Sequence, residues 1–302
     1  MSHTAMKDTI AMNQEKAAAQ KYVWRKAKNE IFRYVFGGAV IIALAALAAL
    51  LGGIFYKGIA NLDWQFMTSY PSRFASQAGI LSAFFGTFAF ISITAPLAFV
   101  VGVSTAIYLE EYAPKNVMTK LLQLNISNLA GVPSIVYGML GLVLFVRGLA
   151  LERSVLAGAL TMAVLVLPVI IVASQEAIKA VPNSLRHASY ALGGTVTQTV
   201  FRVVLPVAMP GIMTGTILAV SRAIGETAPL ITIGALTYVA FLPTSPFSEF
   251  TVLPIQIFNW VSRPQTEFHD IAASGIIVLL AVLLFLNATA IILRNKFRKT
   301  VQ

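Results

Sequence analysis

The chain has 302 residues, of which 57% are hydrophobic and 11% are charged, and it contains no cysteine. Soluble domains are about 45–50% apolar and about 25% charged, so this composition excludes an ordinary soluble domain and predicts an integral membrane protein. The lack of cysteine excludes disulfide, zinc–thiolate and iron–sulfur sites. The three histidines, His3, His187 and His269, lack the spacing of metal ligands, so we predict no metal site.

Six segments are long and apolar enough to cross a bilayer as helices, which takes about 20 residues each. They are 34–56, 82–108, 126–146, 154–174, 209–236 and 271–293, and only the fifth contains charged residues. Continuous apolar runs favour helices over barrel strands, in which apolar and polar residues alternate. We therefore predict an all-α membrane protein with a six-helix domain, 34–293, between a basic segment, 1–33, and a basic tail, 294–302.

Lysine and arginine gather on one side of these predicted spans. With a cytoplasmic N-terminus, 16 of the 22 basic residues fall in the inside segments 1–33, 109–125, 175–208 and 294–302. Basic loops of membrane proteins normally stay in the cytoplasm, so both termini are predicted to be cytoplasmic. The net charge of +10 is then a signal of topology, and it needs no nucleic-acid partner.

The N-terminal region leaves two interpretations open. The basic stretch KYVWRKAKNEIFR, 21–33, either lies on the membrane surface as an amphipathic helix or forms a partly disordered tail. The first span is longer than the apolar core of a signal peptide, so it is predicted to be a retained anchor. On the outside, the connection 237–270 contains three prolines in FLPTSPFSEFTVLP and is expected to be extended, with a short helix near 254–261.

Within the third span, the stretch NLAGVPSIVYGMLGL, 128–142, combines small and polar residues with a proline. Gly131 and Pro133 predict a kink. Ser134 and Tyr137 are candidates either for the lining of a transport path or for packing. The pair Glu110–Glu111, at the inside edge of the second span, is interpreted as a solvated boundary.

The inside connection 175–208 is much longer than a link between two spans requires. Its sequence predicts a first helix that starts at 182–184, with Asn183 or Ser184 as the side-chain cap, and that ends near Leu192 before Gly193–Gly194. Thr195 and Gln198 fit a capping box for a second helix, which is expected to run to a break at Leu205–Pro206. On spacing alone, this hairpin either has no partner or is held by another protein.

Arg222 and Glu226 are the charged residues of the fifth span, in LAVSRAIGETAPLITIG. A charge at the bilayer centre costs roughly 2.5–3.5 kcal/mol on insertion scales, so the pair needs a reason. Gly225 and Pro229 predict a loosened helix beside it. One interpretation is a structural ion pair; the other is a polar patch on a transport path, where a guanidinium suits an oxyanion and Glu226 keeps the empty path near neutral.

Catalytic motifs are missing from the sequence. There is no G-x-x-x-x-G-K-[ST] loop to hold nucleotide phosphates, and no nucleophile–base arrangement or pair of catalytic carboxylates stands out. We therefore predict no catalytic residues and no cofactor in this chain. Any ATP must be bound and hydrolysed by a different chain.

Three motifs together resemble the importer-type ABC permeases. The coupling loop of that family reads Glu-Ala-Ala, three residues, Gly, nine residues, Ile, one residue, Leu-Pro. This chain keeps the spacing, but it has His187 in place of the Glu and Ser189 in place of the second Ala. The positions that correspond to the motif are His187, Ala188, Ser189, Gly193, Val203, Leu205 and Pro206. The stretches SRAIGETAP and NLAGVPSIVYGMLGL are similar to segments of phosphate-importer permeases, and to the subunit type PstA more than to its sister type PstC.

The resemblance implies a six-helix permease bundle in the bacterial plasma (inner) membrane, with a cytoplasmic coupling helix. It further implies a heterodimer with a PstC-like sister permease, two PstB-like ATPase subunits that bind ATP–Mg, and an extracytoplasmic PstS-like phosphate-binding protein. Arg222 and Glu226 match the positions of that family's functional Arg and Glu. Two alternatives stay open: a permease for another oxyanion, such as molybdate or sulfate, and an ATP-independent channel or secondary carrier.

Overall fold

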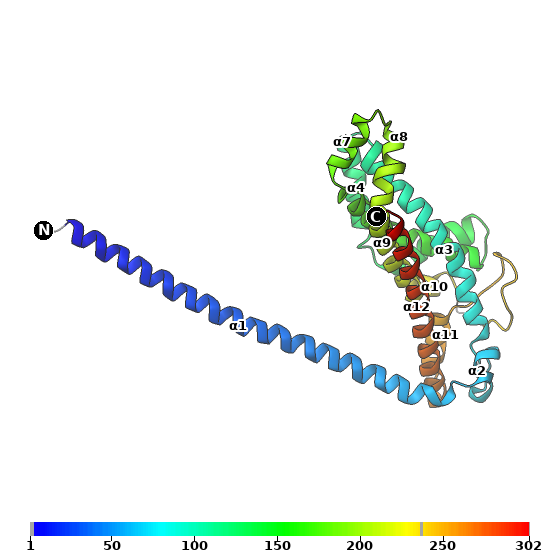
Figure 1. Ribbon diagram of the computed structural model, residues 1–302. Coiled ribbons are helices and arrows are strands. Elements are labelled where there is room, and N and C mark those ends of the chain that lie inside the picture. Colours follow the sequence, from blue (N-terminus) through cyan, green and yellow to red (C-terminus); the bar gives the residue numbers. More distant parts are fainter. Residues whose placement is uncertain (1–2, 236–237, 302) are drawn as a thin grey trace. The chain divides into compact units, whose positions relative to one another are not determined.

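The computed structural model describes residues 3–235 and 238–301, and over these ranges its regular elements are all helices (Figure 1). Side chains are described except at 3–21, 23, 27, 293 and 297–301. The side chains of His3 and of much of the predicted basic segment and tail are therefore outside the description. Five of the described helices are long and apolar enough to cross a membrane, and a bent helix pair brings the number to six. The predicted all-α membrane fold is confirmed.

The chain divides into two compact units, Met1–Tyr56 and Lys57–Gln302. The first consists of helix α1 (His3–Gly58), in which the basic segment and the first span form one uninterrupted helix. A separate surface helix is therefore not formed, because no proline interrupts this alanine- and lysine-rich stretch. The Lys28 ammonium lies 5.9 Å from the ring centroid of Trp24 and 5.7 Å from that of Phe32, so the basic end of α1 also carries aromatic side chains.

Helices α3 (Leu81–Ile107), α6 (Val155–Lys179), α9 (Leu205–Gly225) and α12 (Thr266–Val301) form the core of the second unit. Helix α6 packs between α3 and α9, and α12 packs against α9. Glycines allow the close approach: a Cβ atom at Gly102 would lie 2.7 Å from Ile170, and one at Gly215 would lie 2.3 Å from Ala173. Helix packing in membranes depends on such small residues, so these contacts fix the bundle.

The third predicted span, 126–146, is not a single helix. Helix α4 (Val117–Leu129) is followed by α5 (Ser134–Gly141) and the π-helical turn η4 (Leu142–Gly148), and the two parts meet at an angle of 102°. The predicted kink is thus confirmed, but it is sharp enough to split the span. The reason is Pro133, which precedes the first turn of α5 and has no N–H with which to continue α4.

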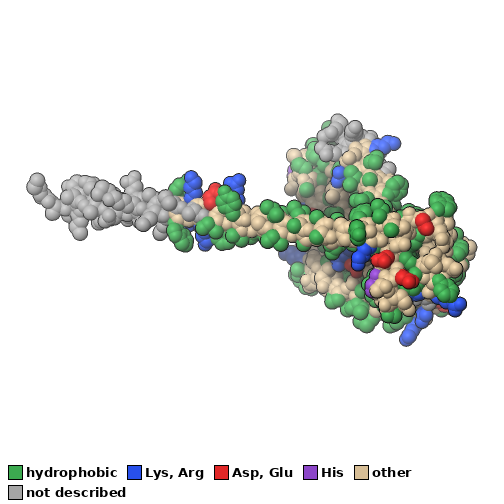
Figure 2. All heavy atoms as spheres, turned by 90° about the horizontal axis from the view of Figure 1, so that it is seen from below, with side chains coloured by type: hydrophobic (Ala, Val, Ile, Leu, Met, Phe, Trp, Pro, Cys, Tyr) green, Lys and Arg blue, Asp and Glu red, His purple; other side chains and the backbone are tan. Residues whose placement is uncertain are grey.

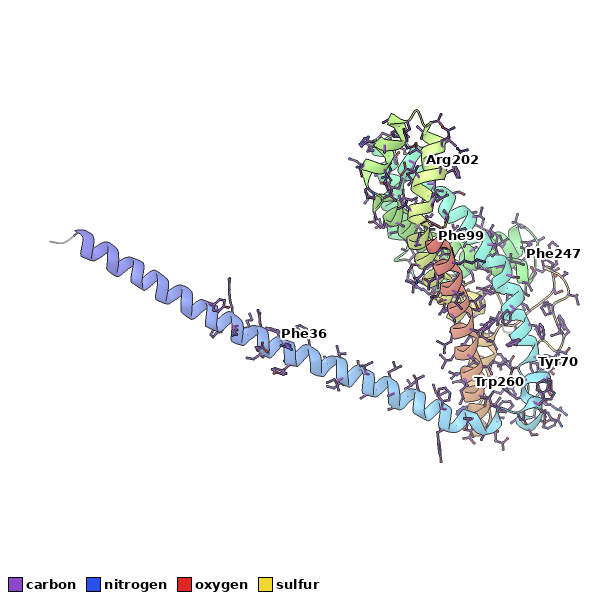
Figure 3. The ribbon with its side chains drawn as sticks, viewed as in Figure 1. Phe36, Tyr70, Phe99, Arg202, Phe247 and Trp260 are labelled. Carbon is purple, nitrogen blue, oxygen red and sulfur yellow. The ribbon has the colours of Figure 1, made fainter. Side chains whose placement is uncertain are left out.

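Short helices cap one end of the second unit. They are η1 (Ile59–Asn61), α2 (Trp64–Thr68), η2 (Ala75–Gln77) and α11 (Leu253–Val261), which confirms the short helix expected near 254–261. Trp260 of α11 is fully buried against the ring of Phe66 in α2, with their centroids 5.8 Å apart (Figure 3). Figure 2 views this end and shows acidic side chains on its surface.

The extended segment before α11 closes the start of α6. The backbone N–H groups of Val155 and Leu156 donate to the carbonyls of Ser248 and Pro246, at 3.0 and 2.8 Å, and the Ser154 hydroxyl accepts from Ala157. These bonds satisfy amide groups that have no partner inside α6. At the opposite end of the unit, α7 (Asn183–Ala191) and α8 (Val196–Thr199) form a hairpin (Figure 1).

Candidate coupling hairpin and transport site

Helix α7, the first arm of the hairpin, ends as predicted. Gly193 has a φ of +82°, which favours glycine. Its N–H donates to the Tyr190 carbonyl at 3.0 Å, and the N–H of Gly194 donates to the Ser189 carbonyl at 3.0 Å, which is the Schellman pattern. Gly194 is required for a different reason, because a Cβ atom there would lie 2.7 Å from the Ser189 hydroxyl oxygen.

The predicted side-chain cap at the start of α7 is wrong. Pro182 occupies the cap position, and neither Asn183 nor Ser184 accepts a capping bond. The proline shifts Asn183 into the first helical turn, where its amide oxygen instead accepts from Arg186 Nη1 at 3.3 Å. The start of α7 is therefore held by an arginine four residues beyond the proline.

The second arm of the hairpin continues into the fifth span. Thr195 and Gln198 form the predicted capping box of α8, with bonds of 3.3 and 3.0 Å. The expected break at Leu205–Pro206 is wrong, because the π-helical turn η5 (Val200–Val204) widens the helix just before the proline, which has no N–H to donate. The 30 residues Val196–Gly225 thus run as one helix, about 45 Å long.

The predicted coupling residues lie on the outer surface of the hairpin and within it. His187 and Ala188 are exposed, and Leu192 beside them is 90% exposed, so α7 presents a mixed polar and apolar surface. Ser189 points inward, where its hydroxyl lies 2.8 Å from that of Thr199 and joins the two arms. Leu205 and Pro206 are half-buried in the helix that carries the second arm onward.

Glu110 and Glu111 do not form a solvated boundary, as the sequence had suggested. Their side chains are 14% and 9% exposed, and both bind other helices. Glu111 forms an ion pair with Arg186 of α7, with Nη2 and Oε1 2.8 Å apart. Sequence reasoning missed Arg186 because its partner lies 75 residues away, and no local spacing reveals such a pair.

The charged pair of the fifth span lies where that helix ends. Helix α9 stops at Gly225, and Glu226 is extended, with φ −75° and ψ 130°; a separate short helix, α10 (Ala228–Thr232), follows. The predicted span 209–236 is therefore too long by the part after Gly225. The Arg222 Nε donates to Glu226 Oε1 at 3.1 Å.

The arginine of this pair is more accessible than its partner. The Arg222 side chain is 57% exposed and that of Glu226 is 18% exposed. Glu226 bonds only to Nε of the guanidinium. The two Nη groups of Arg222 have no partner among the described residues. Such an arrangement leaves the two coplanar Nη groups as donors for an oxyanion, while the bond from Nε to the carboxylate holds the guanidinium in place.

Two of the singled-out motifs meet at Gly138. A Cβ atom at Gly138 would lie 1.8 Å from the Thr232 hydroxyl oxygen and 2.6 Å from Pro229 Cα. Helix α5 therefore lies directly against α10, just beyond the Arg222–Glu226 pair. Sequence reasoning did not select Gly138, although an isolated glycine in an apolar helix is a signal of close packing.

Among the other third-span candidates, Tyr137 stabilises the bend. Tyr137 is buried, and its hydroxyl donates to the Leu129 carbonyl at 2.8 Å, across the break between α4 and α5. The same carbonyl also accepts from the Val132 N–H at 3.1 Å, so two bonds hold the turn at the end of α4. Gly131 is exposed at the turn, and Ser134 is half-buried at the first position of α5. The geometry favours packing over path lining for Tyr137.

Polar contacts also join α9 to α12. The hydroxyl of Ser221, which precedes Arg222 in the sequence, donates to the Asn287 side-chain oxygen. Nearer the other end of α9, Arg294 Nη1 donates to the Thr214 hydroxyl at 3.2 Å. Hydrogen bonds between helices hold membrane bundles together, so the segment with Arg222 is fixed to the last span.

Comparison with known proteins identifies the group to which this arrangement belongs. The family described as "Binding-protein-dependent transport system inner membrane component" matches residues 98–301. The chain belongs to this family. It is therefore a multi-pass inner membrane permease subunit of the ABC importer class, whose permeases function with a substrate-binding protein and ATPase subunits.

Several proteins are similar to the permease over most of its length. It is 35% identical to the probable ABC transporter permease protein YqgI of Bacillus subtilis (strain 168), over 84% of this chain and 86% of that protein. It is 31% identical to the phosphate transport system permease protein PstA 1 of Mycobacterium tuberculosis (strain CDC 1551 / Oshkosh), over 89% and 90%. A bacterial ABC transporter involved in alginate import shares the fold, with a TM-score of 0.61 and 13% identity over 91% and 98%.

Proposed function

We propose that the permease imports inorganic phosphate as one half of an ATP-driven transporter. The observation that carries this proposal is the Arg222–Glu226 pair at the interrupted end of α9, in which the carboxylate uses Nε and the two Nη groups have no partner among the described residues. Similarity to a PstA phosphate permease along 89% of the chain supports the choice of phosphate among oxyanions. The other half of the pore is a PstC-like sister permease.

The pair suits transport better than tight binding. A lone arginine in a low-dielectric path would hold a phosphate strongly and release it slowly. Glu226 keeps the empty site close to neutral, and its bond to Nε holds the guanidinium in one orientation. Phosphate then binds through the Nη groups for long enough to be recognised and leaves when the path opens to the other side.

The hairpin supplies the coupling to ATP. PstB-like ATPase subunits bind ATP–Mg in the cytoplasm and engage α7 at His187 and Ala188, while a PstS-like phosphate-binding protein docks at the opposite end of the unit, on 57–80 and 237–270. This arrangement requires cytoplasmic termini, in agreement with the predominance of basic residues on that side. Movement of the hairpin then opens the path alternately to the two sides.

Substitution of Arg222 tests this proposal. In the full complex, Arg222→Gln is expected to reduce phosphate uptake by at least about 100-fold, because a neutral amide cannot replace a charge-assisted pair of donors. Arg294→Gln is the matched control, since it removes another arginine that bonds to a side chain of α9, Thr214, without touching the pair. Normal uptake by Arg222→Gln, at an unchanged amount of complex, would contradict a role in the path.

The alternative of another oxyanion follows from the same geometry, because a guanidinium fork accepts sulfate and molybdate as well. Competition decides between them. We expect excess phosphate to suppress uptake of labelled phosphate, and sulfate or molybdate at the same concentration to leave it nearly unchanged. Stronger competition by either of these anions would assign the permease to that anion instead.

A further inference from the structure

Two adjacent carboxylates lie at the end of α3 that faces the hairpin. The π-helical turn η3 (Tyr108–Tyr112) extends α3 and contains Glu110 and Glu111 in succession. Both side chains are largely buried, at 14% and 9% exposure. Buried carboxylates are costly unless they are paired and hydrogen-bonded, so their partners define what this turn does.

Glu111 binds the first arm of the hairpin. Its Oε1 lies 2.8 Å from Nη2 of Arg186, whose side chain is only 15% exposed. The same guanidinium donates to the carbonyls of Ile178 and Val181, at 3.0 and 2.7 Å, at the end of α6 and just beyond it. One planar group therefore joins α7, the end of α6 and the end of α3.

Glu110 binds two other helices. Its Oε1 accepts from Gln175 of α6 at 2.7 Å and from Gln123 of α4 at 3.3 Å, and Lys179 Nζ lies 3.6 Å away. Neighbouring carboxylates thus divide their partners, with Glu111 toward the hairpin and Glu110 toward the bundle. The turn η3 is consequently the junction between α7 and helices α3, α4 and α6.

We propose that Glu111 and Arg186 form the joint through which movement of the coupling hairpin reaches α3. The inference rests on the proposed ATP-driven transport and assigns these two residues as positioning residues for it. Three connections link the hairpin to the core helices: α8 continues directly into α9 and carries movement toward Arg222, α7 follows α6 after the short link 180–182, and only side chains connect the hairpin with α3. Beside the Glu111–Arg186 pair, a longer and exposed bond of 3.4 Å from the Tyr112 hydroxyl to the Thr197 hydroxyl makes that third connection. All three connections must act together for the path to change sides.

Loss of the joint has a specific consequence. Helices α6 and α9 still follow the ATPase through the backbone that joins them to the hairpin, but α3 no longer follows it. ATP is then hydrolysed without a matching amount of transport. A merely structural ion pair behaves differently, since its loss lowers ATP hydrolysis and transport together, in proportion to the amount of folded complex.

The experiment measures ATP hydrolysis and phosphate uptake in the same vesicles, which contain the full complex with its binding protein. Glu111→Gln removes the charge but keeps the shape, and Arg186→Lys keeps the charge but has one nitrogen for four acceptors. Phosphate transported per ATP is expected to fall at least about five-fold in both variants, a typical size for coupling between sites. Glu176→Gln, which removes an exposed partner of Lys179, is the control and leaves the ratio unchanged.

An unchanged ratio of phosphate transported to ATP hydrolysed in both variants, including a proportional loss of both activities, would contradict the proposed joint. Should the variants not assemble, hydrogen exchange on the unaltered complex decides: addition of ATP is expected to change exchange at 108–112 together with 183–199, and a response of the hairpin alone contradicts the proposal. If the unaltered complex hydrolyses ATP but moves no phosphate, the proposed substrate fails, and the exchange measurement still tests the joint.

Discussion

The permease interrupts two of its predicted spans, and the two interruptions are built differently. Between α4 and α5, the turn is braced, because the buried Tyr137 hydroxyl bonds to the Leu129 carbonyl across it. Between α9 and α10, the chain leaves Gly225 exposed, with no neighbour within 4 Å of a Cβ placed there, and puts the accessible Arg222 beside it. The first interruption serves the shape of the bundle, and the second leaves functional groups accessible.

This difference has a physical basis. Irregular backbone at membrane depth is tolerated where protein buries it or where it lines a water-filled cavity. The α4–α5 turn has a buried tyrosine as its internal partner, whereas the α9–α10 break has a charged side chain that is 57% exposed. We therefore expect substitutions at the first site to change stability and those at the second to change transport.

After Arg222→Gln, the largest effect on this comparison is expected from Arg222→Lys. A lysine keeps the charge but cannot donate to Glu226 and to an anion with the same planar geometry, so uptake should fall by about 10- to 100-fold while the complex stays intact. Phosphate uptake and the yield of purified complex measure the two quantities. Wild-type uptake would show that charge alone is needed at this break.

A second large effect is expected where the two interrupted regions touch. Gly138→Leu would drive a side chain into Thr232 and Pro229, where even a Cβ atom lies as close as 1.8 Å. Overpacking of this kind costs about 1–3 kcal/mol or more, so α10 should separate from α5 and the melting temperature should drop. Gly138→Ala is the milder comparison. A variant with unchanged stability and uptake would mean that this contact does not position the pair.

A smaller effect is expected from Tyr137→Phe at the braced turn. The variant keeps the ring but loses the bond to the Leu129 carbonyl, which retains the Val132 N–H as a donor, so the cost is about 0.5–1.5 kcal/mol. Thermal unfolding of the purified complex should show the loss, while uptake per complex stays within about two-fold. Abolished uptake with unchanged stability would instead indicate that Tyr137 lines the transport path.

The smallest effect is expected from Gly225→Ala. A Cβ atom has open space there, and alanine is about 1 kcal/mol better than glycine inside a helix, so α9 should be slightly stabilised. A modest decrease in uptake would follow if the end of the helix must move, and it would be measured against Gly211→Ala, a position in the packed part of α9 where a Cβ lies 2.8 Å from Ala177.

Sequence reasoning predicts the local features of this permease well and the tertiary ones poorly. The capping box at Thr195–Gln198 and the end of α7 at Gly193 follow from residues within a few positions of each other, and both are confirmed. The break predicted at Pro206 is not formed, because the π-helical turn η5 lets the helix continue past a residue without an N–H group. No residue propensity indicates such a turn. The burial of Glu111 depends on Arg186, 75 residues away, so the sequence alone suggested a solvated edge.

The candidate site shows the same division. Arg222 and Glu226 are prominent because charges in an apolar span are costly, and they do form the predicted pair. The end of α9 at Gly225 was not foreseen, since Gly225 and Pro229 indicated only a loosened helix. The contact of Gly138 with α10 arises from packing between separate helices, and a sequence gives the residue without its neighbour.

One measurement tests the central claim most directly: flux of labelled phosphate into vesicles that contain either the complete transporter or the permease alone. The account predicts uptake only by the complete complex, only with ATP and binding protein present, and at least about 100-fold less when Arg222 is replaced by glutamine. Rapid phosphate flux through the permease alone, in vesicles free of nucleotide, would contradict it.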